Sequence, residues 1–386
     1  MEPTVTTIKG TSSPALSKPL MGLYLISFLS GFSMGIFNPL ISILMEQQGI
    51  DQLWIGANSS LYYLMIAAFA PLAGKLIRHY GINSVMVAGI LITAASACVL
   101  PGVHELGTLF GVRALMGLGV CFYMVGGQTG LNIYADNERR GVIVATHGAA
   151  FGVGFIISPL IGTLLYAHVG TFAFLAGAGV ILLGAPAALL LLPNLVVHYQ
   201  PVLSSGLIGK ISIPLHGAFI YGALEGIIVS LLPLLLLRQA MPLSVLGLPL
   251  TLFMVASGIG MIPVSFFGDK FGRSNVLLVS AGIGLMTLMA VMNVQHPYVI
   301  AASAVLLGLS LGTFFPVTLA MIGEKLTASE MHAGSGLFTA AFSYGCVAGP
   351  LCAAFLMSRF GDSHIFTLIV LLLIPLILRM TPKHKR

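Results

Sequence analysis

The sequence predicts an all-α membrane protein in which twelve transmembrane helices form two six-helix halves. Composition is the first reason, because 57% of the residues are hydrophobic and only 7% are charged, too little charge to cover a soluble surface of this size. The second reason is a repeat, since Gly31 recurs as Gly222 and the later members keep the same shift of 191 residues. The third is that nearly all Lys and Arg residues fall on one side of the predicted helices.

Twelve hydrophobic stretches are long enough to cross a bilayer core, which takes roughly 20 residues per helix. The first is too long for the apolar core of a signal peptide, and no small-residue cleavage site follows it, so we expect it to be retained. The stretches lie near residues 20–45, 53–77, 84–100, 106–134, 141–167, 170–192, 211–237, 243–267, 275–293, 298–323, 331–357 and 364–380.

The repeat is carried by glycine and proline, which set backbone geometry and therefore indicate two copies of one fold unit. Six spans per half is an even number, so both halves have the same topology and form a parallel repeat about an axis normal to the membrane. The first-half members are Gly31, Gly35, Gly56, Gly81, Gly117, Gly154, Pro159 and Gly170. Their second-half counterparts are Gly222, Gly226, Gly247, Gly272, Gly308, Gly345, Pro350 and Gly361.

The basic residues predict the orientation. Of the 17 Lys and Arg residues, 14 share one side, which the positive-inside rule assigns to the cytoplasm together with both termini. Arg238 and Arg359 fall on the other side, and Arg113 lies inside a span. The 14 are Lys9, Lys18, Lys75, Arg78, Arg139, Arg140, Lys210, Lys270, Arg273, Lys325, Arg379, Lys383, Lys385 and Arg386.

The predicted organisation follows from these spans. Residues 193–210, which contain Pro193 and Pro201, are typical of a short linker. The predicted parts are a disordered cytoplasmic tail over 1–19, an N-terminal six-helix bundle over 20–192, a cytoplasmic linker over 193–210, a C-terminal six-helix bundle over 211–380 and a basic cytoplasmic tail over 381–386.

Several classes of function are not favoured by the sequence. The net charge of +6 follows from the membrane topology, so we infer no nucleic-acid partner from it. Cys98, Cys121, Cys346 and Cys352 lie in apolar spans without metal-ligand spacing, and we expect neither a metal nor a cofactor. No phosphate-binding GxxxxGK[ST] loop occurs, which argues against an ATP-driven pump.

Loop motifs carry a family resemblance. The run Gly268-Asp269-Lys270-Phe271-Gly272-Arg273 resembles the loop signature G-x-x-x-D-[RK]-x-G-R of the major facilitator superfamily. Its first-half counterpart, residues 74–81, keeps Gly74 and Gly81 but has Arg78 in place of Asp. The resemblance covers residues 20–380 and implies the major facilitator fold, with Asp269, Lys270, Gly272 and Arg273 controlling the cytoplasmic gate. Asp269 is expected to pair across the two halves when the cytoplasmic side is closed, against the alternatives of a helix cap and a solvated loop charge.

Helix motifs extend the resemblance. The run from Arg113 to Gly119 is similar to the family's intramembrane Arg motif. The run from Gly154 through Pro159 to Gly162 is similar to the motif of the antiporter branch, and Gly345, Gly349 and Pro350 repeat it in the eleventh span. Small residues four apart let helices pack closely and Pro bends them, so these positions serve packing, pivoting between two states, or both.

Two charges lie well inside the spans. Each costs roughly 2.5–3.5 kcal/mol near a helix centre on insertion scales, so neither is expected to face lipid. Glu225 lies near mid-membrane in the seventh span, and Tyr221, one turn earlier, is placed to donate a hydrogen bond to it. Its repeat counterpart is Met34, so the acid belongs to one half only. We expect Glu225 to couple protons or bind substrate, against the alternative of a structural tie.

Arg113 is the other intramembrane charge. Gln128 lies near the same face of the fourth span and extends a polar stripe. The family resemblance implies that Arg113 controls protonation, whereas a hydrogen-bond hub is the alternative. Asn38 and Asn58 are further cavity candidates, because an amide in hydrocarbon needs a partner.

The resemblance implies a secondary active transporter that works by alternating access. The antiporter-like motif favours proton-coupled export of a small organic solute, such as a drug or a siderophore, across a bacterial inner membrane. A proton-coupled nutrient importer of the same fold is one alternative, and a non-transporting receptor or scaffold is another. The expected partners are a small-molecule substrate, protons and the lipid bilayer, with the protein acting as a monomer. No nucleophile–base spacing indicates an enzyme.

Overall fold

The computed structural model describes residues 17–135, 139–195, 206–294, 296–327 and 330–381. Most of the predicted tails and of the predicted linker therefore lies outside the described residues. The first half contains α1 (Lys18–Gln47), α2 (Gln52–Tyr80), α3 (Ile82–Val99), α4 (Leu106–Tyr134), α5 (Arg140–Val169), α6 (Ala173–Leu182) and α7 (Gly184–Leu191). The second half contains α8 (Leu207–Lys210), α9 (Ser212–Ser230), α10 (Leu232–Arg238), α11 (Leu248–Phe271), α12 (Arg273–Asn293), α13 (Pro297–Ser310), α14 (Phe314–Lys325), α15 (Met331–Phe360) and α16 (Thr367–Met380).

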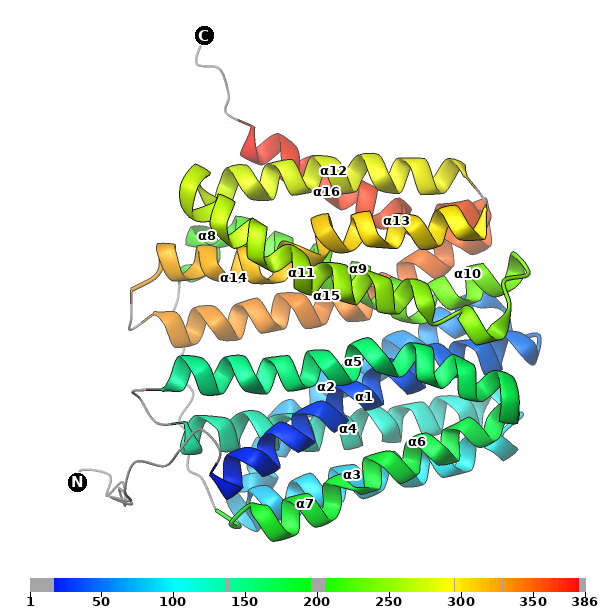
Figure 1. The fold of residues 1–386 in the computed structure, drawn as a ribbon, viewed down its shortest axis with the longest axis vertical. Helices are drawn as coiled ribbons and strands as arrows, with labels where there is room; N and C mark the ends of the chain where they lie inside the picture. The colour runs from blue at the N-terminus through cyan, green and yellow to red at the C-terminus, as the bar shows by residue number, and fades with distance from the viewer. Residues whose placement is uncertain (1–16, 136–138, 196–205, 295, 328–329, 382–386) are drawn as a thin grey trace.

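The number of membrane crossings depends on one glycine. Among the described residues, eleven helical segments are long and apolar enough to span a membrane, and one of them covers Arg140–Leu191. Its 52 residues are about twice what one crossing needs. The segment turns at Gly170, whose φ of 60° favours glycine, so that α5 and α6–α7 are two separate spans (Figure 1). The described chain therefore crosses twelve times, and the predicted fold class is confirmed.

Two spans of the second half are interrupted. The break between α9 and α10 precedes Pro233, and the 3₁₀ turn η4 between α13 and α14 precedes Pro316. Proline lacks the N–H that continues a helical ladder, which accounts for both breaks. The 3₁₀ turns are η1 (Leu100–Gly102), η2 (Gly170–Phe172), η3 (Leu243–Val245), η4 (Leu311–Thr313) and η5 (Asp362–Phe366).

The repeat seen in the sequence is also a repeat of backbone contacts. A Cβ on Gly31 of α1 would overlap the carbonyl of Phe151 in α5, and a Cβ on Gly222 of α9 would overlap that of Phe342 in α15. Both members of the second pair lie 191 residues beyond those of the first. Each glycine thus lets two helices of one half approach closely, and the halves are built alike.

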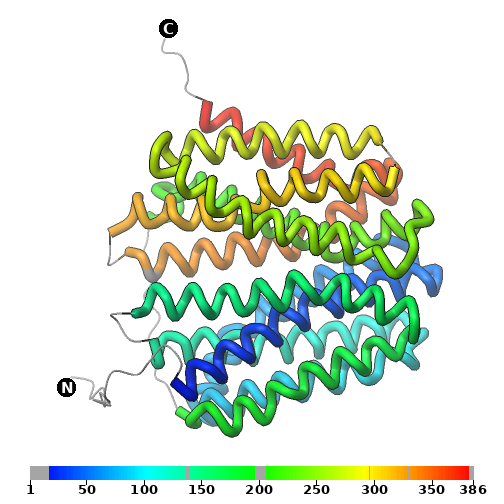
Figure 2. Tube along the Cα trace, viewed as in Figure 1, coloured from blue at the N-terminus to red at the C-terminus, as the bar shows by residue number. Residues whose placement is uncertain are grey.

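The two halves lie side by side, with the spans of both running in the same general direction (Figures 1 and 2). We call the side with the turns at Gly81 and Gly272 the predicted cytoplasmic side, and the side with the turns at Gly170 and Gly361 the predicted external side. Large apolar side chains such as Leu190 and Ile262 are 81% and 77% exposed. Such exposure suits a surface in contact with lipid rather than water.

Candidate transport site

Two charged residues are buried among those that the structure describes, and both are sequence-predicted site residues. Arg113 of α4 is 1% exposed and Glu225 of α9 is 7% exposed. The first belongs to one half of the molecule and the second to the other. Because buried charge in a membrane protein is costly, the contacts of these two side chains define the candidate site.

Arg113 is held without an acidic partner among the described residues. Its Nη2 donates a hydrogen bond to Oδ1 of Asn38 in α1, and Nη1 lies 4.0 Å from the sulfur of Met116. Its guanidinium carbon lies 4.3 Å from the ring centroid of Tyr62 in α2, a cation–π contact. Nε has no hydrogen-bond partner. The positive charge is therefore offset by an amide and an aromatic face, and no carboxylate in the described part of the chain neutralises it.

Glu225 lies beside aromatic rings. The hydroxyl of Tyr221, one turn earlier in α9, lies close enough to interact with its carboxylate. The Tyr221 ring stacks on Phe342 of α15, with centroids 5.8 Å apart, and lies 5.7 Å from the ring of Phe315 in α14. Phe315 also meets Phe342 edge-on at 5.4 Å. Three helices thus form an aromatic cluster of Tyr221, Phe315 and Phe342, of which Tyr221 lies next to the buried acid.

Tyr63 links the surroundings of the two charges. It is 5% exposed, its hydroxyl has no hydrogen-bond partner, and it lies within electrostatic reach of both Glu225 and Arg113. The adjacent Tyr62 ring, over which the Arg113 guanidinium lies, meets the Tyr63 ring edge-on, with ring centroids 5.2 Å apart. An unpaired buried hydroxyl between an acid and a base is available to a bound solute or to water.

The remaining predicted polar residues are placed differently. Asn58 donates from Nδ2 to the Leu109 carbonyl at 3.3 Å, so it ties α2 to α4. Gln128 is exposed on the predicted cytoplasmic part of α4. Sequence reasoning missed Tyr63 and Phe342, because neither carries a charge or a motif. The signal for Phe342 was its repeat partner Phe151, which lies against Gly31 as Phe342 lies against Gly222.

The predicted gating loops make contacts inside single halves. Arg273 lies 3.4 Å from Asp269 and 3.0 Å from Glu324, and it donates to the Ala320 carbonyl at 2.9 Å. The Lys270 ammonium lies 5.3 Å from the Phe271 ring centroid. All of these residues belong to the second half. None of these contacts crosses to the first half.

The first-half loop and the start of α15 likewise make contacts within a single half. Gly81 and Gly272 both have a φ of 86°, as the repeat requires, and a Cβ on Gly81 would overlap Asn194 of the same half. A Cβ on Gly74 would meet no atom within 4 Å. Lys210 lies 2.6 Å from Glu330, and this bond, with the Thr327 backbone, lowers the pKa of Glu330 to about 2. Lys210 and Glu330 both belong to the second half.

The helix motifs lie where helices touch. Gly154 and Gly345 each have a backbone carbonyl of the neighbouring helix, from Phe28 and Phe219, where a Cβ would stand. Gly349 meets the Ala223 carbonyl in the same way. Pro159 and Pro350 lie inside α5 and α15. The packing role of these small residues is therefore visible in the structure.

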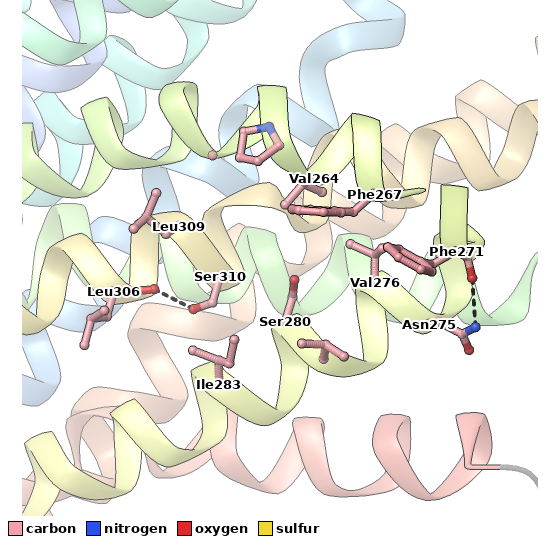
Figure 3. Close-up of a pocket in the computed structure, with 13 residues that line it drawn as sticks. Val264, Phe267, Phe271, Asn275, Val276, Ser280, Ile283, Leu306, Leu309 and Ser310 are labelled. Carbon is pink, nitrogen blue, oxygen red and sulfur yellow. Dashed lines mark hydrogen bonds between the residues drawn. The ribbon is translucent and has the colours of Figure 1, made fainter. Parts of the chain in front are cut away.

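A groove of about 530 Å³ lies elsewhere, between α11, α12 and α13 (Figure 3). Its lining is apolar, with Phe267, Phe271 and Ile283 among the residues shown. Two of its polar side chains are bonded to backbone, since Ser310 donates to the Leu306 carbonyl of its own helix and Asn275 of α12 donates to the Phe271 carbonyl at the end of α11 (Figure 3). It contains neither Arg113 nor Glu225 and is not the candidate transport site.

Twelve spans in two repeated halves, with buried opposite charges in different halves, define a membrane transporter. The family model of the Major Facilitator Superfamily matches residues 23–207 and 215–386, and the chain belongs to this superfamily. Its members are secondary transporters and not enzymes, which confirms the predicted family and class.

Similar proteins support the same assignment. The chain is 26% identical to the MFS-type transporter YfkF of Bacillus subtilis over 363 residues, covering 91% of this chain and 92% of that one. It is 25% identical to the MFS-type transporter YcaD of Salmonella dublin, with 92% of each covered. Among solved structures, the nucleoside transporter NupG aligns with a TM-score of 0.77 at 14% identity, covering 95% of this chain and all of that one. A bacterial homologue of the lysosomal transporter Spinster, inward-facing and unoccupied, aligns with a TM-score of 0.75 at 12% identity, covering 96% and 94%.

Proposed function

We propose that this chain exports a small organic solute in exchange for protons, by alternating access across the bacterial inner membrane. The observation that carries the proposal is Glu225, a buried acid with a hydrogen-bond donor, Tyr221, on the same helix. A carboxyl group in this position can take up a proton on one side and release it on the other. The direction rests on the antiporter-like run that includes Gly154 and Pro159.

The surroundings of Glu225 indicate the kind of solute. A carboxylate next to Tyr221, whose ring packs with those of Phe315 and Phe342, suits a group that is both apolar and positively charged or polarised. Arg113 and Asn38, on the other half, add donors for an anionic or carbonyl group. The combination favours an amphipathic or zwitterionic solute over a polyanion.

The proposed membrane placement follows the basic residues. We place the side with Lys270 and Arg273 in the cytoplasm, together with both termini, and we propose that the protein acts as a monomer. Reactivity of single introduced cysteines toward a membrane-impermeant reagent in intact cells tests the orientation, and detergent-corrected light scattering tests the monomer.

Import is the second candidate, favoured by the similarity to NupG, which is a nucleoside transporter. Everted and right-side-out vesicles separate the two directions. In everted vesicles with an imposed pH gradient, an exported solute dissipates the gradient when it is added outside, whereas an imported solute accumulates in right-side-out vesicles. The probes are tetraphenylphosphonium, a catecholate siderophore and uridine. Gradient-independent movement of every transported probe would overturn proton coupling.

A further inference from the structure

One guanidinium joins the two halves at the predicted external side. Arg238, the last residue of α10, lies with Nε 2.7 Å from Oε1 of Glu46 and Nη2 3.1 Å from Oε2 of the same carboxylate. Nη1 lies 2.8 Å from Oδ1 of Asp362 in η5 and also donates to Gln52 at the start of α2. Glu46 and Gln52 belong to the first half, whereas Asp362 belongs to the second, like Arg238 itself.

The pairing with Glu46 uses what is particular to arginine. Two parallel N–H groups of one planar fork meet two oxygens of one carboxylate, which fixes the relative orientation of α10 and α1. The Arg238 and Glu46 side chains are only 29% and 18% exposed, so water screens the pair less than an ordinary surface pair. This geometry also explains a basic residue on the side where the positive-inside rule leaves few.

The polar bonds between the two halves are unevenly distributed. Besides those of Arg238, the described residues show the Gly247 N–H donating to Oγ1 of Thr163 at 3.1 Å and Oγ1 of Thr251 donating to the Ile156 carbonyl at 2.8 Å. Gly247 and Thr251 lie at the predicted external end of α11. The ion pairs found on the predicted cytoplasmic side, by contrast, each stay within one half. Among the described residues, the polar bonds that join the two halves therefore lie at the predicted external side.

We propose that Arg238 is the latch of the external gate, and that its two bonds to Glu46 and its bond to Gln52 must break each time the site opens outward. Asp362 moves with Arg238 as part of the same half, so its bond persists and keeps the guanidinium aligned for closure. This inference rests on the alternating-access function proposed above, and it assigns a gating role to a residue that lies outside the family's loop and helix motifs.

The experiment compares two neutralising changes that each remove one acid from the same guanidinium. Glu46→Gln removes the pair that crosses between the halves, and Asp362→Asn removes a pair of similar length within one half. Spin labels at positions 172 and 298 report the external side, and labels at positions 142 and 325 report the cytoplasmic side. Distances are measured in nanodiscs without any solute, in a background lacking the four native cysteines.

Glu46→Gln and Arg238→Gln are expected to raise the outward-open population about threefold or more, with longer external distances and shorter cytoplasmic ones. Asp362→Asn is expected to change it less than twofold. The swap of Glu46→Arg with Arg238→Glu, made together with Asp362→Asn so that the new acid has no like charge beside it, restores the closed external side, which also covers the case in which Arg238→Gln fails to fold. Unchanged distances in Glu46→Gln, or equal shifts in Glu46→Gln and Asp362→Asn, would overturn the latch. Because no solute is needed, a failure of the proposed transport activity leaves this result readable.

Discussion

Gly247 lies against Pro159 so closely that a Cβ at position 247 would overlap the Pro159 carbonyl. Gly247 precedes α11 in the second half, and Pro159 lies in α5 of the first. The repeat places the matching contact between Gly56 of α2 and Pro350 of α15, again with the proline carbonyl against the site of a Cβ. The two halves therefore touch through two equivalent glycine–proline contacts, and both glycines lie near the predicted external ends of their helices.

These contacts predict that a methyl group at either glycine separates the halves. Gly247→Ala and Gly56→Ala should each destabilise the closed external side by about 1–3 kcal/mol, since the opposing atoms, the two proline carbonyls and the Cβ of Ala354, cannot rotate away. Hydrogen–deuterium exchange should therefore become faster at the external ends of α5 and α11 in Gly247→Ala, and at those of α2 and α15 in Gly56→Ala. Gly258→Ala is the matched control, because nothing lies within 4 Å of a Cβ there. Equal exchange rates in the wild type and both variants would show that the contact between the halves accommodates the methyl group without separating them.

The sequence could predict these halves because glycine and proline record backbone geometry directly. Gly31 and Gly222 keep the 191-residue shift because both need the same close approach of a carbonyl, from Phe151 and from Phe342. A pattern within one helix was equally accessible, since Tyr221 and Glu225 are four residues apart and share a helix face.

Contacts between helices that are distant in the sequence could not be predicted from the sequence. The stacking of Arg113 on Tyr62 and its bond to Asn38 depend on which spans are neighbours and on which rotamers they adopt. Arg238 was visible in the sequence only as an exception to the charge rule. Its partner Glu46 is 192 residues away, and no spacing rule connects them.

The second prediction concerns coupling. Glu225→Gln keeps the size of the side chain and a carbonyl oxygen beside Tyr221 but can neither take up nor release a proton, so gradient-driven transport should be abolished while the protein inserts and folds. Proton and solute flux in proteoliposomes measure this. Glu105→Gln, which changes an exposed acid before α4, is the control and should transport normally. Wild-type proton-driven flux in Glu225→Gln would remove Glu225 from the mechanism.

The third prediction concerns the unequal cytoplasmic loops. Asp269 binds Arg273, and the family resemblance implies that it stabilises the closed cytoplasmic side. Arg78 occupies the equivalent place in the first half and carries the opposite charge. Asp269→Asn should therefore shift the population toward the inward-open state more than Arg78→Ala does. Spectroscopic distances across the cytoplasmic face give the comparison, and equal shifts would count against the asymmetry.

The last prediction separates the charge of Arg113 from its shape. A single ammonium group cannot both lie over the Tyr62 ring and donate a directed N–H to Oδ1 of Asn38, so Arg113→Lys keeps the positive charge and loses part of the network. Coupling should be impaired while solute binding remains. Arg113→Ala should be worse, because it leaves the buried Asn38 oxygen unpaired at a cost of about 1–3 kcal/mol.

The measurement is solute affinity together with the pH dependence of transport, for the probe that the vesicle assays identify. Arg140→Lys is the matched control, because Arg140 also donates to an asparagine, Asn132 at 2.7 Å, but at an exposed position. It should leave both quantities unchanged, since an exposed ammonium is free to reach Asn132 or water. If neither Arg113 variant alters the pH dependence, Arg113 is a structural residue and Glu225 handles the proton without it.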